Sequence, residues 1–120
     1  WRAAEDTSTD IMGRLAVVPM VLEARGLDVT PGMIEVFRKA KADDAVAALE
    51  TIYGEEVAHV AYGSKWFHFL CGRDGLDPKP TFHALVRQYF HSTLKPPFNE
   101  EKRAEAGIPP DFYWPLTGDV

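Results

Sequence analysis

The sequence is short of cysteine and of positive charge, and it has no long apolar run. Cys71 is the only cysteine among the 120 residues, so no disulfide can form within the chain and thiolate ligation of a metal is disfavoured. A single thiol suits a reducing, cytoplasmic setting. The net charge of −5 argues against a nucleic-acid partner. The longest apolar run, residues 15–22, is too short to span a bilayer, so we expect no membrane partner.

Motifs of several common enzyme classes are absent as well. The sequence contains no His-Glu-x-x-His zinc motif, no glycine-rich phosphate loop and no Gly-x-Ser-x-Gly nucleophile turn. What it does contain is 46% hydrophobic and 12% aromatic residues, which is typical of a folded globular protein. A length of 120 residues fits a single domain over residues 1–120.

Apolar residues recur with helical spacing, and no segment alternates with period two over the length of a strand. We therefore predict an all-α fold with two long antiparallel helices and short C-terminal helices. Residues 7–10 can cap a helix or lie inside one that begins near Trp1. Pro19 predicts a kink, and Gly26 and Gly72 are predicted to end the two long helices. The predicted helices cover residues 11–25, 31–40, 43–71, 79–91 and 100–106, with a linker at 27–31 and an irregular aromatic tail from 111.

Two acidic residues and one histidine are predicted to face the core. Glu56 and His59 are three positions apart on the long central helix, so their side chains project from one face about one turn apart. Glu23 shares a face of the earlier helix with apolar residues. An acidic side chain in such a position is costly unless it is paired, protonated or bound to a metal. At about 100° per residue, the predicted core stripe of the central helix contains Leu49, Ile52, Glu56, His59, Gly63, Trp66 and Leu70.

Glu23, Glu56 and His59 are therefore candidate metal ligands. Carboxylates together with imidazole suit iron, with manganese possible, better than zinc or copper. The alternative is that Glu56 and His59 form a buried structural pair that binds no metal. The other histidines lie off this face or in the later helix, and we expect surface or packing roles for them: His68, His83 and His91.

Three segments resemble the ferritin-like family called domain of unknown function 455. They are residues 18–31 (VPMVLEARGLDVTP), 55–60 (EEVAHV) and 94–99 (LKPPFN). The resemblance implies a ferritin-like bundle in which Glu23 is the lone glutamate of the third helix. Glu56 and His59 would then be the Glu-x-x-His pair of the fourth. The family is distantly similar to di-iron tRNA hydroxylases and rubrerythrin-like proteins.

The resemblance also implies that this chain holds only half of a di-iron site. A complete site takes two lone glutamates and two Glu-x-x-His pairs, and the first half of the longer family members would supply the others. The chain opens on Trp1, without an initiator Met. We expect the missing N-terminal half of the same protein, or a second copy in a homodimer, to complete the site. Residues 1–72 would hold the bundle helices and residues 73–120 an aromatic-rich helical appendix.

The function implied by the resemblance is that of a di-iron oxidase or hydroxylase. It would activate dioxygen on a small-molecule substrate that the residues do not identify. The alternative, from a different class, is a non-catalytic helical module that handles iron or serves as a structural interaction module. The segment that completes the site discriminates between them, because a second Glu-x-x-His pair favours redox chemistry.

Overall fold

The computed structural model describes residues 5–118, of which 77% are helical. Within these residues, the only pairing of extended segments is an isolated parallel bridge between Leu94 and Thr117. The predicted all-α fold is therefore confirmed. None of the helices in this part of the chain is both long and apolar enough to cross a membrane.

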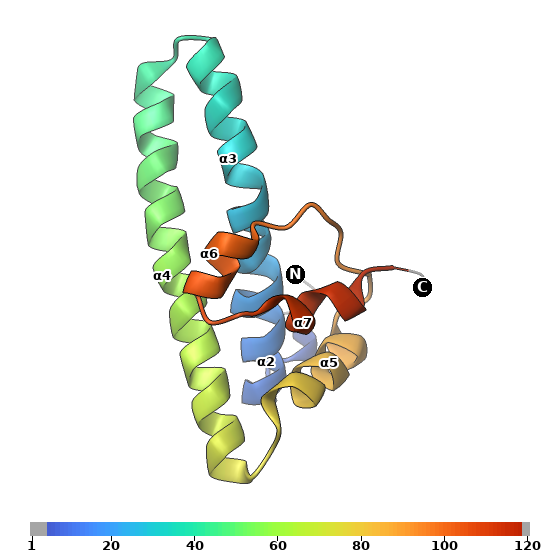
Figure 1. Ribbon diagram of the computed structural model, residues 1–120. Coiled ribbons are helices and arrows are strands. Elements are labelled where there is room, and N and C mark those ends of the chain that lie inside the picture. Colours follow the sequence, from blue (N-terminus) through green and yellow to red (C-terminus); the bar gives the residue numbers. More distant parts are fainter. Residues whose placement is uncertain (1–4, 119–120) are drawn as a thin grey trace.

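A single long helix forms from three consecutive segments near the N-terminus (Figure 1). Its middle segment has the wider turn of a π-helix, so the chain gains one residue there without leaving the helix. The predicted kink at Pro19 is thus a wider turn inside a continuous rod. The three segments are α2 (Ile11–Val17), η1 (Val18–Glu23) and α3 (Ala24–Lys39).

The predicted helix end at Gly26 and the predicted linker at 27–31 are wrong, because this stretch lies inside α3. Tertiary contacts here outweigh the local preference for a break. Leu27 is fully buried, and the Asp28 carboxylate accepts a hydrogen bond of 2.6 Å from Nη2 of Arg103. A loop at this position would give up both contacts.

The longest helix, α4 (Asp43–Asp74), runs antiparallel to α3 (Figure 1). Two acidic residues occupy its first turn, where the helix dipole favours negative charge. It ends three residues beyond the predicted position at 71. The reason is that Gly75, with φ of 69°, takes the left-handed capping conformation that Gly72 was predicted to take. The backbone N–H of Leu76 then donates to the carbonyl of Cys71 at 2.8 Å and closes the cap.

The C-terminal third of the chain folds back against these two rods. Helix α5 packs on α2 and α4, α6 contacts α3 and α4, and α7 contacts α5 (Figure 1). The tail predicted to be irregular contains short helical turns, because Phe112 and Tyr113 are drawn into the core. The bounds are α5 (Pro78–Tyr89), α6 (Glu100–Glu105), α7 (Pro110–Tyr113) and the 3₁₀ turn η2 (Trp114–Leu116).

The core lies where all of these elements meet. The ring of Phe82 on α5 contacts those of Phe67 on α4 and Phe112 on α7, with centroid distances of 6.0 and 5.3 Å. The other end of the α3–α4 hairpin extends past this core (Figure 1). There Val36 is 66% exposed, so no element of residues 5–118 covers that part of the hairpin.

Candidate metal site

The structure brings Glu23, Glu56 and His59 together between the two long rods. Glu23 is the last residue of the π-helical segment η1, and the other two lie one turn apart on α4. One ligand atom from each residue can be chosen so that all three lie within 4.8 Å of one another. The imidazole Nδ1 of His59 lies 3.9 Å from Oε2 of Glu56. These are the three residues that the sequence singled out as ligands.

The wide turn that carries Glu23 has a local cause in Pro19. Proline has no backbone N–H, so the usual hydrogen bond to the residue four positions earlier is missing. The chain responds with a π-type bond, in which the N–H of Ala24 donates to the carbonyl of Pro19 five residues back. Glu23 therefore follows directly on a backbone feature that often marks functional sites.

The proline ring also sets how closely η1 approaches α4. It packs directly on Gly63, and a Cβ at position 63 would overlap the Pro19 ring. Near the ligands the helices are close as well, since Cγ of Glu56 lies 3.7 Å from where a side chain on Gly26 would begin. Close packing at these two glycines places the carboxylate of Glu23 beside that of Glu56.

Glu56 is less exposed than its neighbour on α4, His59. Its side chain is 22% exposed, and its Oε1 atom is buried without a hydrogen-bond partner among the described residues. Burial raises the pKa of Glu56, the neighbouring Glu23 carboxylate raises it further, and His59 acts in the opposite direction. A buried carboxylate oxygen without a donor is costly, and either a proton or a cation relieves that cost.

The donor set fits a transition-metal ion. Ligand atoms on opposite sides of one such ion are about 4 Å apart, so a spread of up to 4.8 Å closes by small side-chain rotations. His59 can make that movement because its side chain is 57% exposed. Two carboxylates with one imidazole match the preference of iron and manganese.

The predicted orientation of the α4 stripe is only half right. Gly63 and Leu70 are buried, but Ile52 and Trp66 are more than half exposed, as is His59 between them. The face of α4 that turns to the core is offset from the predicted one, because α2, η1 and α3 all pack on one side of α4. The residues that it buries include Val60, Ser64, Phe67 and Cys71.

The remaining histidines have structural contacts outside this cluster, as the sequence predicted. Nδ1 of His68 lies 2.8 Å from the backbone carbonyl of Ser64 in its own helix. Nε2 of His83 lies 3.0 Å from the backbone carbonyls of Asp111 and Phe112, so it fastens α5 to α7. Nε2 of His91 lies 3.0 Å from the Asp6 carboxylate.

Sequence reasoning missed a second group of polar residues, separate from Glu23, Glu56 and His59. The Asp28 carboxylate is 1% exposed and accepts two hydrogen bonds from Arg103, at 2.6 and 2.9 Å. It accepts a third from the backbone N–H of Asn99, at 2.7 Å. An arginine in a short helix rich in charged residues carries no signal of burial. The only local indication that Asp28 is buried was its position beside the apolar Leu27. The prediction of a linker over residues 27–31 argued against a buried position.

Comparisons with known proteins found a matching family model and a curated relative. The family model described as "Protein of unknown function (DUF455)" matches residues 1–114. A protein of Haemophilus influenzae described as "Uncharacterized protein" is 40% identical over 108 residues, which is 90% of this chain and 38% of that protein. The chain therefore spans little more than a third of the length of the curated relative it matches. No solved structure matches the chain.

Proposed function

Because this chain belongs to the DUF455 family, as its sequence resemblance predicted, we propose that it supplies Glu23, Glu56 and His59 as half of a di-iron carboxylate centre. The complete protein would be a ferritin-like oxidase or hydroxylase. The observation that carries the proposal is the clustering of these three ligand atoms around a buried carboxylate oxygen that has no hydrogen-bond donor.

The residues of this chain would share the work of holding the metal. Glu23 and Glu56, from neighbouring helices, would bind or bridge the ions with their carboxylates, and His59 would bind one ion terminally. A di-iron centre held in this way supplies the electrons and open coordination positions for dioxygen activation. Manganese is the next best metal for the same donors.

Three ligands are too few for two ions, so further ligands must come from elsewhere. A ferritin-like di-iron site takes two lone glutamates and two Glu-x-x-His pairs, of which this chain holds one of each. The side of α4 that bears His59 also carries large apolar side chains that residues 5–118 leave uncovered. Its exposed side chains are Ile52 at 55%, Tyr62 at 62%, Trp66 at 54% and Phe69 at 57%.

We call these four side chains the apolar stripe: Ile52, Tyr62, Trp66 and Phe69. We propose that an N-terminal segment of the same polypeptide covers it. The length of the Haemophilus relative supports a further segment of the same polypeptide, since 62% of it (100% minus the matched 38%) lies outside the match. A second copy of the chain, related by a two-fold axis, is the other arrangement that would supply the same ligands.

A non-catalytic role is the second candidate, and the exposure of His59 favours it. An imidazole that is 57% exposed beside an apolar stripe also suits an interaction module, in which a partner docks and metal is held without turnover. The covering segment distinguishes the two roles. A second Glu-x-x-His pair in it favours an oxidase or hydroxylase, and its absence favours iron handling or a purely structural contact.

The experiment is elemental analysis and absorption spectroscopy of the complete protein from iron-supplemented cells. We expect about two irons per site and the absorption of an oxo-bridged di-iron centre. The variant His59→Ala should lose at least half of the iron, whereas His91→Ala should keep it, because His91 binds Asp6 and lies outside the cluster. Equal iron loss in both variants, or iron-free wild-type protein, would refute the metal site.

A further inference from the structure

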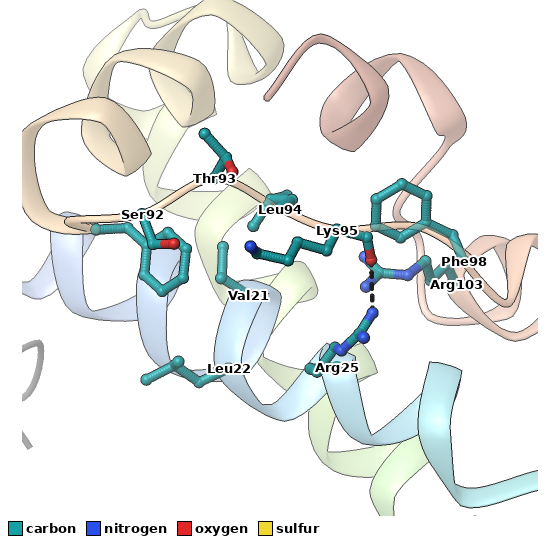
Figure 2. A pocket seen from close by; sticks show the side chains of 10 residues that line it. Val21, Leu22, Arg25, Ser92, Thr93, Leu94, Lys95, Phe98 and Arg103 are labelled. Atoms are coloured by element: carbon teal, nitrogen blue, oxygen red, sulfur yellow. Dashed lines mark hydrogen bonds between the residues drawn. The ribbon is translucent and has the colours of Figure 1, made fainter. Parts of the chain in front are cut away.

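A small pocket that does not include Glu23, Glu56 or His59 is lined by cationic and apolar residues. It lies between the first rod and the extended segment that joins α5 to α6, and its volume is about 210 Å³ (Figure 2). None of its ten lining residues is acidic, although the whole chain has a net charge of −5. Three of them are cationic: Arg25, Lys95 and Arg103.

Arg103 is the most constrained of the three cations. Its side chain is 3% exposed, and its guanidinium lies over the rings of Phe98 and Tyr113 at 4.8 and 4.5 Å from their centroids. Nε and Nη2 are both used in the paired contact with Asp28. The remaining nitrogen, Nη1, is buried and has no hydrogen-bond partner among the described residues. It therefore keeps two N–H groups for a ligand in the pocket.

The other two cations also have donors to spare. Arg25 uses Nη1 to donate to the backbone carbonyl of Lys95 at 2.6 Å, and the same atom lies 3.5 Å from Asp28. No carboxylate of the described residues lies within 4.0 Å of the Lys95 ammonium group. Figure 2 shows the Lys95 side chain running back over the pocket towards Val21. With one carboxylate for three cations, the site has an excess of two positive charges.

The rest of the wall is apolar apart from two hydroxyl groups. Val21, Leu22, Leu94 and two phenylalanines form most of it, and Ser92 and Thr93 add donors on the loop side (Figure 2). A cavity of about 150 Å³ can hold a benzene molecule. The volume here therefore suits one ring or a short branched chain, together with an acidic head group.

We propose that this pocket binds a small organic oxyanion, with a carboxylate or phosphate head and an apolar body about the size of one ring. The head group would lie against Lys95, Arg25 and Nη1 of Arg103, where charge-assisted hydrogen bonds are strongest because Arg103 is desolvated. The body would pack on Val21, Leu22 and the phenylalanines. This site is separate from the metal ligands and does not depend on iron.

The test is calorimetric titration of the complete protein with benzoate, phenyl phosphate and the neutral isostere benzamide. We expect saturable binding of benzoate or phenyl phosphate and binding at least about tenfold weaker for benzamide. The stronger of the two anions identifies the head group. Equal binding of benzamide would overturn the anion site, and so would a wild-type protein that binds neither anion.

Matched variants locate the binding to the pocket. Lys95→Met keeps the apolar stem of the side chain and should weaken anion binding about tenfold. Lys95→Arg keeps the positive charge and should bind the anion about as tightly as wild type. Lys39→Met removes an exposed lysine from the last turn of α3, away from the pocket, and should change the affinity by less than about twofold. An equal effect of Lys39→Met and Lys95→Met would show that the anion responds only to overall charge.

Discussion

Asp10 is a single residue that ties two distant parts of the chain together. Its Oδ1 accepts a hydrogen bond of 3.0 Å from the backbone N–H of Gly13 and so caps α2. Its Oδ2 accepts one of 2.6 Å from the hydroxyl of Tyr89, at the end of α5. The bond from Gly13 does most to lower the pKa of Asp10, the bond from Tyr89 lowers it further, and burial opposes both. The cap belongs to the predicted capping segment 7–10, but nothing local announces a partner 79 positions away.

We expect Asp10→Ala to lower the free energy of unfolding by about 1–2 kcal/mol at pH 7, because a helix cap and a partly buried hydrogen bond to Tyr89 are lost together. The folded pKa of Asp10 lies below the unfolded value near 3.8. The stabilisation is therefore complete above that pH and disappears as the pH falls through the folded pKa. Urea unfolding at several pH values measures this.

The isosteric variant Asp10→Asn is the control for that measurement. Asparagine caps helices about as well as aspartate but does not titrate, so this variant should keep most of the stability at pH 7. The difference in the free energy of unfolding between Asp10→Asn and wild type should also become smaller as the pH falls. A cost of Asp10→Ala that stays constant down to pH 2 would contradict the role given to the carboxylate.

At the scale of elements, the contact between Pro19 and Gly63 determines how η1 sits on α4. The proline creates the wide turn, and the glycine allows its ring to pack against the helix backbone. Gly72 lies on the same helix, but among residues 5–118 nothing outside its own stretch of helix lies within 4 Å of where its side chain would begin. The two glycines therefore have different structural roles, and the predicted helix end at Gly72 is not one of them.

We expect Gly63→Ala to destabilise the protein by about 1–3 kcal/mol, because the new methyl group forces η1 away from α4. Gly72→Ala should instead stabilise it by about 0.5–1 kcal/mol, through the gain in helix propensity alone. Thermal unfolding of both variants measures the difference. Equal changes in stability in the two variants would mean that the contact with Pro19 leaves room for a methyl group at position 63.

The same elements show which features the sequence could predict. The long helix α4 and the one-turn spacing of Glu56 and His59 follow from periodicity, which is a local property. The continuation of the first long helix through Gly26 does not follow from periodicity, because contacts of Leu27 and Asp28 with distant residues decide it. The exposed side of α4 was missed for a related reason. A helix with apolar residues on several faces does not reveal which face its neighbours within the same chain will cover.

At the scale of the whole molecule, large apolar side chains remain in contact with solvent along α4. The apolar stripe of Ile52, Tyr62, Trp66 and Phe69 is accompanied on α3 by Met33, Val36 and Phe37, which are 38–66% exposed. Large exposed apolar side chains gathered on two neighbouring helices are typical of a binding face. Ile11 on α2 is also exposed, at 59%, but it lies outside the stripe.

We expect residues 1–120 produced alone to self-associate. The double variant Ile52→Glu, Trp66→Glu should shift them towards monomer. In the complete protein, the same pair should lower stability by at least about 2 kcal/mol, because we propose that a further segment covers the stripe there. Sedimentation and urea unfolding make the two measurements, and Ile11→Glu should have little effect in either. A monomeric fragment that melts cooperatively, together with a complete protein that tolerates both charges, would refute the covered stripe.

The ion pair between Asp28 and Arg103 also has a consequence for the order of folding. It joins residues 75 positions apart, whereas the turn between α3 and α4 is closed by residues 40–42. Local contacts close before distant ones, so the helical hairpin should form first and the C-terminal segment should dock last. Arg25 comes from the early part and Lys95 and Arg103 from the late part. The anion pocket therefore exists only in a chain that has finished folding, and a ligand bound there would favour the last step of assembly.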